Sequence, residues 1–569
     1  MQSFLRTFIL NKDFHTKKDS HTKEDFHTNC PLSDPEWFNI NLIQERIRVC
    51  DTTHGKECKK SGIRATSTWS QPPRSDRAGD SVPLQTGPKW LIDVKNQCIV
   101  PAQSHRYIAL SYVWGGVRAT EATVATIATL QQPGALSFRS KYAEVPKTVR
   151  HAMGLLQCLN ERYLWVDRLC ICQDDTEEKH SQIVAMGHIY ERAYYTIVFA
   201  DGGDADYGLR GIKGITEPLP FTSDAHGNKT FMRKGVDLSC TKWYSRAWTF
   251  QEMVLSPRKL IFNDSAYAWE CSGGYWPEYF ANPVKYGWQK DLREKGRERC
   301  YFDLIAKYNN RDLTFPEDGL NAFLGVIPHF LDCFPSGFLW GLPIDMLHLA
   351  LLWWPTTNAI GGRGRRNSKQ AAAIQLPSWS WCGWQGYVDF PESKEIIPTI
   401  TLSYNDDGVS VALEQGNVLS VSNRRSDLTQ QASTTLLVHG SVARCKIGDA
   451  EGVVKNSTTG SALFLTSAKG AMSLCGMVRH WPPHSRTQGI YNDCELLSLA
   501  CSKELPGLAS EWRDELAFKF QATECGPHGY VIVILIERVA GVAYRKEIGF
   551  VMMSAWELMS PNRETLYLQ

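Results

Sequence analysis

The chain has 569 residues, 43% of them hydrophobic and 21% charged, and its 62 basic and 60 acidic residues give a formal net charge of +2. This length is too great for one core and predicts several domains. The balanced charge excludes an overall field that favours nucleic acid or membranes. The 17 cysteines are odd in number and include no CxxC pair, so they fit neither a disulfide framework nor a zinc module. We expect a reducing, cytoplasmic location and no metal ligands.

Residues 1–85 are predicted to be a disordered N-terminal tail and linker. Residues 13–28, with the sequence DFHTKKDSHTKEDFHT, carry too few apolar side chains to offset the entropy cost of ordering. A second polar stretch from Thr52 to Lys89 is rich in Ser, Pro, Lys and Arg, which is typical of a linker. The N-terminus has no apolar segment of the kind that directs secretion.

Residues 86–265 are predicted to form an α/β domain. Short apolar runs alternate here with helical periodicity, which is typical of parallel βαβ units. We expect helices to begin at Pro146, after a cap at Asp175 supported by Glu178, and after a cap at Ser245. Four strands are expected, at residues 107–112, 162–167, 194–200 and 259–264.

The rest of the chain divides at about residue 376. Helical patterns dominate residues 266–375, whereas residues 376–569 contain short β-type runs with glycine or polar breaks and predict a C-terminal β-rich domain. The most apolar stretch, residues 338–355, contains Pro343, Asp345 and His348. It therefore predicts a buried helix and no membrane span.

Polar residues follow the predicted parallel strands where they end. Ser111 to Gly116 follow the first strand, and Asp167 ends the second. Ligands of open parallel sheets bind beyond the carboxyl ends of the strands, and Gly115 permits close backbone approach and a positive φ. The first loop either faces a ligand or is a tight turn with Trp114 in the core, and the residues alone leave both interpretations open.

A carboxylate and an indole share one face of the predicted helix that starts at Ser245. At 100° per residue, Trp248 lies one turn before Glu252. Next to an indole in a half-closed pocket, Glu252 would lose solvation and its pKa would rise, as a catalytic carboxylate requires near neutrality. The alternative is a solvated glutamate paired with Arg246 or Arg258.

Five ordered blocks resemble the fungal heterokaryon-incompatibility (HET) domain. They are ALSYVWG (109–115), VPKT (145–148), LWVDRLCICQDD (164–175), MGHIYERA (186–193) and SRAWTFQEMVLSPR (245–258). Residues 310–326 and 376–384 resemble segments that commonly follow this domain. On this basis residues 86–265 are identified as a HET domain. Cys172 departs from the family pattern, which usually has an acidic or amide side chain there, and this leaves open an altered or inactive protein.

The resemblance implies a role in nonself recognition and programmed cell death after fusion of genetically different hyphae. The HET domain is thought to be a distant relative of TIR domains, which implies a flavodoxin-like (TIR-like) parallel sheet. Some TIR domains cleave NAD at the nicotinamide–ribose bond with a glutamate four positions after a tryptophan, the spacing of Trp248 and Glu252. Glu252 is therefore the expected catalytic residue. The expected NAD-binding residues are Ser111, Trp114, Gly115, Asp167 and Trp248.

Three functions remain open. The first is a NAD glycohydrolase, with NAD as substrate and no tightly bound cofactor. The second is a non-enzymatic TIR-like signalling module that assembles with itself or with an incompatibility partner protein. The third is an inactive paralogue. A shared fold does not separate them, because function depends on the site that the fold carries.

Overall fold

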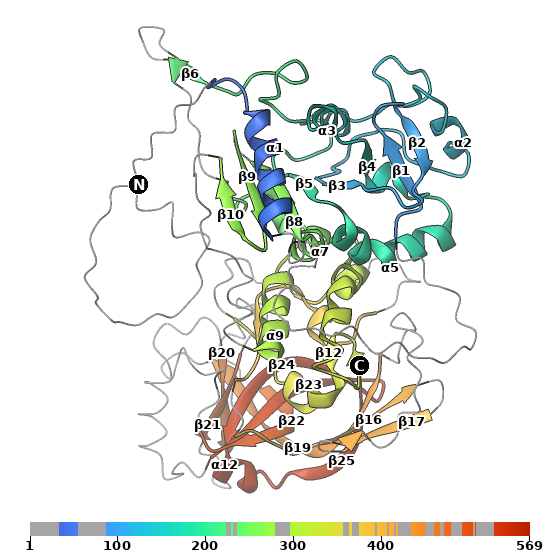
Figure 1. Ribbon diagram of the computed structural model, residues 1–569. Helices are drawn as coiled ribbons and strands as arrows, with labels where there is room; N and C mark the ends of the chain where they lie inside the picture. Colours follow the sequence, from blue (N-terminus) through green and yellow to red (C-terminus); the bar gives the residue numbers. More distant parts are fainter. Residues whose placement is uncertain are drawn as a thin grey trace. The chain divides into compact units, whose positions relative to one another are not determined.

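The structure is a computed structural model that forms two compact units, Met1–Lys295 with Leu324–Val326, and Gly296–Phe323 with Ile327–Gln569. Figure 1 shows both units, and each is described by itself. The described residues are 34–54, 58, 87–223, 229–230, 236–263, 265–278, 296–356, 364–366, 375–392, 395–406, 409–414, 417–418, 434–449, 460–466, 472–479, 492–504, 507 and 529–569. The histidine-containing repeat at residues 13–28 lies outside them.

A mixed sheet forms the centre of the first unit (Figure 1). In the described chain its strands lie in the order β10-β9-β8-β5-β3-β4-β1-β2. Strands β4, β3, β5 and β8 are parallel, and the outer pairs on both sides are antiparallel. The strands are β1 (Trp90–Asp93), β2 (Cys98–Pro101), β3 (Ile108–Ser111), β4 (Tyr163–Trp165), β5 (Thr196–Phe199), β8 (Arg258–Asn263), β9 (Ala266–Cys271) and β10 (Gly274–Pro277).

The four parallel strands lie in the order second, first, third and fourth along the chain. A flavodoxin-like sheet begins with the same order, and its ligands bind where the connections diverge, between the first and third of these strands. In this chain those two strands are β3 and β5. The predicted α/β parallel sheet is confirmed, and the antiparallel strands at both edges are an addition to the prediction.

Helices cover both faces of this sheet. Figure 1 shows α3 on one side and α5 and α7 on the other, and α5 and α7 are in contact. This arrangement follows from right-handed connections between parallel strands. The helices are α1 (Ile40–Val49), the π-helical turn η1 (Cys50–His54), α2 (Ile127–Leu130), α3 (Lys147–Cys158), α4 (Asp167–Cys170), α5 (Thr176–Arg192), α6 (Lys242–Ser245) and α7 (Trp248–Leu255); a small hairpin joins β6 (Thr222–Ser223) to β7 (Lys229–Thr230).

Two of the three predicted helix starts are confirmed. Pro146 is the N-cap residue of α3, and the Asp175 side chain accepts a 3.0 Å hydrogen bond from the backbone N–H of Glu178 at the start of α5. The predicted cap at Ser245 is wrong. Ser245 ends the short helix α6, and Arg246 is extended with ψ 138°. This break delays the start of α7 to Trp248.

The N-terminal segment differs from the expected tail, because residues 34–54 contain α1 and η1. Phe38, Ile43 and Ile47 are 5%, 0% and 9% exposed and belong to the core of the first unit. The Phe38 ring lies 5.4 Å from the ring of Phe262 on β8. Burial of this apolar face offsets the entropy cost of ordering the helix.

The second unit contains the β-rich region expected after residue 376. Its pairings close into a ring that runs β19-β22-β23-β24-β21-β20 and returns to β19. The strands are β15 (Ile397–Pro398), β16 (Thr401–Asp406), β17 (Val409–Glu414), β18 (Asn417–Val418), β19 (Leu436–Asp449), β20 (Gly460–Thr466), β21 (Met472–Arg479), β22 (Asn492–Ser502), β23 (Tyr530–Val539), β24 (Val542–Met552) and β25 (Asn562–Leu568), and α12 (Met553–Leu558) lies between the last two.

The region expected to be mainly helical, residues 266–375, is mixed. It begins with β9 and β10, and the apolar stretch from residue 338 contains two short hairpin strands and a four-residue helix, with Pro343 ending β12. The expected buried helix there is therefore wrong. The described elements that precede β15 in the second unit are α9 (Arg297–Tyr308), η4 (Pro316–Gly319), η5 (Asn321–Phe330), β11 (Phe338–Leu339), β12 (Leu342–Pro343), η6 (Ile344–Met346), α10 (Leu347–Ala350), β13 (Trp354–Pro355), η7 (Trp381–Gly383) and β14 (Val388–Asp389).

Aromatic residues join the two segments that resemble the regions following a HET domain. The Trp381 ring, on η7, lies 5.3 Å from the ring of Phe323 and 5.7 Å from that of Tyr308. Its indole N–H donates a 3.0 Å bond to the carbonyl of Gly341. Tyr308, Phe323 and Trp381 therefore form one packed aromatic cluster inside the second unit. In the described part of the chain, no helix is long and apolar enough to cross a membrane.

The docking of α1 gives a stability prediction. Replacing the fully buried Ile43 with alanine should destabilise the first unit by about 2–5 kcal/mol, because the change leaves a cavity in the sheet core. Asn41→Ala on the exposed side of α1 is the matched control and should have little effect. Urea unfolding followed by pulse proteolysis of the full chain measures both variants. Equal stability of the two variants would contradict the docking of α1.

Candidate functional site

The candidate site lies at the carboxyl ends of β3 and β4. Ser111 is the last residue of β3, and Asp167 follows β4 as the first residue of α4. Both ends belong to the edge where ligands of doubly wound sheets bind, and β3 is one of the two strands next to the switch in strand order. Helix α7 brings Glu252 to the same place.

Ser111, Glu252 and Trp243 are joined by hydrogen bonds. The Ser111 hydroxyl bonds to the carboxylate of Glu252 and accepts a 2.7 Å bond from the indole N–H of Trp243 on α6. All three side chains are buried, with Glu252 only 5% exposed. Strand β3 and the consecutive helices α6 and α7, which follow it by more than a hundred residues, therefore meet through one hydroxyl group.

Burial controls the ionisation of Glu252. Loss of water, and to a smaller extent the nearby negative charge of Asp167, raise its pKa from 4.5 to a net value of about 7. The hydrogen bond from Ser111, the positive charge of Arg246 and the phenol of Tyr190 oppose this rise. The predicted rise in pKa is confirmed. Glu252 is therefore divided between its acid and its carboxylate near neutral pH.

Asp167 is the second carboxylate of the site. Its side chain accepts a 2.7 Å bond from the indole N–H of Trp114 and a 2.8 Å bond from the backbone N–H of Arg168. Burial raises the pKa of Asp167 to about 6 in spite of these bonds. The guanidinium of Arg168 lies 4.5 Å from the centre of the Trp114 ring, which is half-buried. Asp167 thus holds the indole in place.

Arg246 supplies positive charge beside the two carboxylates. It occupies the extended residue between α6 and α7 and donates a 3.0 Å bond to the carbonyl of Tyr112. Its charge lowers the pKa of both Asp167 and Glu252. The sequence left open a pairing of Glu252 with Arg246. In the structure Arg246 acts on Glu252 electrostatically, and Ser111 is the hydrogen-bond partner of Glu252.

Gly115 has the positive φ and the close backbone approach that were expected, whereas Trp248 lies in surroundings different from those expected. Gly115 has a φ of +61°, and a Cβ atom there would lie 2.3 Å from the Cβ of Asp204. Glycine is therefore required by the close approach of the loop after β5. Trp248 is half-buried against the apolar core, and the indole joined to Glu252 through Ser111 belongs to Trp243. NAD binding by these residues remains a prediction.

Cys172, the departure from the family pattern, is a buried thiol. Its sulfur lies 3.4 Å from a carboxylate oxygen of Asp174, and that oxygen accepts a 2.8 Å bond from the N–H of Val124. The thiol thus supports the loop between α4 and α5.

A separate surface cleft of about 430 Å³ lies on the loops before α3. Phe138, Tyr142 and Arg150 are among its lining residues. Ser111, Asp167 and Glu252 do not line it. The cleft therefore adds no access to the buried carboxylates.

Trp243 and Tyr190 were missed by the sequence analysis, which considered Arg246 only as a possible partner of Glu252. Arg246 and Trp243 lie next to the predicted helix start at Ser245, which the structure places at the end of α6. Tyr190 belongs to a family block, and its hydroxyl donates a 3.2 Å bond to the carbonyl of Leu110 on β3. The block motifs were therefore the available signal for Tyr190 and Arg246, whereas Trp243 lies outside the blocks.

Comparison with known proteins places this site inside a matched segment. The family model described as heterokaryon incompatibility protein (HET) matches residues 107–252. Heterokaryon incompatibility protein 6, OR allele, of Neurospora crassa is 36% identical over 164 residues, which cover 28% of this chain and 22% of that protein. No solved structure shows significant similarity to the chain. Ser111, Asp167 and Glu252 all lie within the family match.

The buried carboxylate makes stability depend on pH. Folded Glu252 holds its proton more tightly than the unfolded chain does, so its favourable contribution is complete below about pH 4.5 and is lost as pH rises through 7. Between pH 5 and pH 8, Glu252→Gln should therefore gain about 2–3 kcal/mol of stability relative to the wild type. Pulse proteolysis in urea at both pH values measures this difference.

The wild-type chain is the control, because titrating groups that do not interact with Glu252 contribute equally to both chains; Asp167, which does interact with it, is part of the measured difference. A difference in stability that is constant from pH 5 to pH 8 would show that Glu252 titrates as an ordinary exposed glutamate.

Proposed function

We propose that this chain, whose residues 107–252 are a HET domain, acts in fungal heterokaryon incompatibility. The similarity to an incompatibility protein of Neurospora crassa supports this proposal, and it covers 22% of that protein. Nonself recognition and programmed cell death are the roles that follow for the whole chain. The buried carboxylates of the candidate site suggest a reaction that the HET domain would catalyse.

The chemistry that we assign to the HET domain is hydrolysis of NAD at the nicotinamide–ribose bond. In this reaction the bond from the ribose carbon to the nicotinamide nitrogen breaks, and nicotinamide leaves with the electron pair. The ribose becomes oxocarbenium-like, and a carboxylate next to it stabilises the positive charge. Water then adds to the same carbon and releases a proton, which gives ADP-ribose.

The observation that carries this proposal is the hydrogen bond between Ser111 and Glu252 at the carboxyl end of β3. It holds a carboxylate with a pKa of about 7 at the edge where parallel sheets bind ligands. A group that is partly ionised near neutrality can stabilise positive charge and can also transfer a proton. The strand order, which begins as in flavodoxin-like sheets, supports the proposed kinship with TIR domains.

The other polar residues would position the substrate. The half-buried Trp114 ring, fixed by Asp167 through its N–H, offers a flat face on which a base can stack. Asp167 carries the second carboxylate and would bind ribose hydroxyl groups. Arg246 would balance the two negative charges when both carboxylates are ionised.

The burial of Glu252 favours a second candidate function. At 5% exposure, and with Ser111 as a direct partner, its carboxyl group has the satisfied bonding of a structural residue. In this case the HET domain would be a non-enzymatic module that assembles with itself or with an incompatibility partner. The two candidates differ in whether substrate reaches Glu252.

Glu252→Gln tests the enzymatic proposal. The variant keeps the shape of the side chain and removes the negative charge, so we expect it to fold and to lose NAD hydrolysis by at least about a hundredfold. The measurement is nicotinamide release from NAD by the purified full chain, followed by chromatography. Glu191→Gln on α5 is a matched control, because Glu191 is also a buried carboxylate, at 9% exposure, and should retain activity.

Two results would contradict this proposal. Equal nicotinamide release by the wild type and Glu252→Gln would remove Glu252 from the chemistry. A folded wild-type chain that releases no nicotinamide but associates with increasing concentration in sedimentation velocity would support the assembly module.

A further inference from the structure

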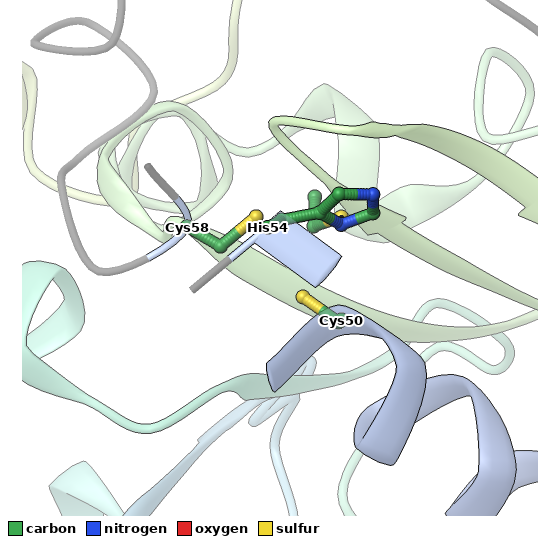
Figure 2. Close-up of side chains that lie close together, drawn as sticks. Cys50, His54 and Cys58 are labelled. Atoms are coloured by element: carbon green, nitrogen blue, oxygen red, sulfur yellow. The ribbon is translucent and has the colours of Figure 1, made fainter. Parts of the chain in front are cut away.

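Four potential metal ligands from distant parts of the chain meet in the first unit. Cys50 and His54 are the first and last residues of η1, Cys58 follows them, and Cys271 ends β9. One ligand atom from each residue lies within 4.8 Å of every other. Figure 2 shows Cys50, His54 and Cys58 side by side. His54 and Cys271 are 217 residues apart in the chain, so this arrangement is a product of the fold.

The donor set and its spacing fit a tetrahedral metal ion. Three sulfur atoms and one imidazole nitrogen are a set that structural Zn²⁺ sites use, and bonds of about 2.3 and 2.0 Å put neighbouring ligand atoms about 3.5–3.8 Å apart. The Nδ1 atom of His54 lies 3.5 Å from the sulfur of Cys271. Small side-chain movements would bring the remaining ligand atoms to the same spacing.

The surroundings are polar in a way that suits thiolates. Cys50, Cys58 and Cys271 are 1%, 1% and 3% exposed. The Ser272 hydroxyl lies 2.7 Å from the sulfur of Cys58, so it can donate a hydrogen bond to a thiolate there.

A buried positive charge lies next to these sulfur atoms. Arg258, which is 1% exposed, acts electrostatically on Cys50 and Cys58. Its Nε and Nη2 atoms have no hydrogen-bond partner among the described residues, although Nη1 pairs with Asp51 at 2.8 Å. A Zn²⁺ ion with three thiolates has a net charge of −1, which this guanidinium would help to neutralise.

The hairpin between β9 and β10 is shaped around the imidazole. A Cβ atom on Gly273 would lie 2.2–2.5 Å from three atoms of the His54 ring, so only glycine leaves room for the ring there. The ring of Trp276 on β10 lies 5.5 Å from the same imidazole. His54 is therefore held by the hairpin that also carries Cys271.

The cluster lies away from the candidate active site. Cys271 pairs with Arg258, the first residue of β8, and therefore marks the amino-terminal edge of the parallel strands. Ser111 and Asp167 lie at the opposite, carboxyl-terminal edge. Four protein ligands also leave no open position for a substrate, which is typical of structural and not catalytic zinc.

We propose that Cys50, His54, Cys58 and Cys271 bind one structural Zn²⁺ ion that fixes the end of α1 to the β9–β10 hairpin. Binding replaces the three thiol protons, which are released to solvent, and requires a neutral imidazole. No electron transfer is involved. Since the ion would tie the N-terminal segment to the sheet, its binding energy would contribute to the stability of the first unit.

Metal analysis of the full chain tests this proposal. After reconstitution with zinc under reducing conditions and removal of free metal, we expect elemental mass spectrometry to find about one zinc ion per chain. Cys58→Ser and Cys271→Ser should each lose most of this zinc. Cys98→Ser is the matched control, because Cys98 is also buried, at 3% exposure, and lies on β2 outside the cluster. It should retain the zinc.

Cobalt binding to the wild type keeps the test valid if the serine variants fail to fold. Co²⁺ in this site should give the visible bands of a tetrahedral ion and a charge-transfer band from thiolates, and zinc should displace both. A strong chelator should also lower the unfolding temperature of the first unit. A folded wild-type chain without bound zinc and without the cobalt bands would overturn the proposal, as would a disulfide among these cysteines under reducing conditions or equal zinc loss in Cys98→Ser.

Discussion

Burial of the parallel strands on both faces is the constraint on which the first unit depends. Every residue of β3, β5 and β8 is buried, because helices cover the two faces of the sheet. The strands therefore carry mainly apolar side chains. The polar side chains of this unit that lie at the carboxyl ends of the strands are close together at one edge of the sheet and have little contact with water. Asp167 and Glu252 have raised pKa values for this reason, since burial penalises their charged forms, and Glu252 is bonded to the buried hydroxyl of Ser111.

Elements fixed by local physics could be predicted from the sequence, and elements fixed by docking could not. The cap at Asp175 works because its partner, the N–H of Glu178, is three residues away. Helix α1 depends instead on core contacts of Ile43 and Ile47, which a polar sequence context conceals. Ser245 failed as a cap because Thr241, which is also a favourable N-cap residue, starts a shorter helix before it.

The site shows the same division. The rule that ligands bind at strand ends identified Ser111 and Asp167, and the helical spacing in a family block identified Glu252. Gly115 was predicted from the conformational freedom of glycine. Its close neighbour Asp204 could not be predicted, because it lies in the loop after β5, which is distant in the chain. Trp243 was missed because its bond to Ser111 spans 132 residues, and no local pattern records such a contact.

The cysteines show why spacing rules missed the proposed metal site. Cys50, His54 and Cys58 follow one another at intervals of four residues, whereas zinc modules are recognised by cysteine pairs with shorter spacing. The fourth ligand, Cys271, comes from the β9–β10 hairpin, which is distant in the chain. Arg258 joins this cluster to the carboxylate site, because it begins β8 two residues after Ser256, whose hydroxyl donates a 2.6 Å bond to the carbonyl of Glu252. A metal ion that orders η1 and β9 would therefore also hold the strand that anchors α7. Stability supplied at one edge of the sheet would offset the cost of burying carboxylates at the other.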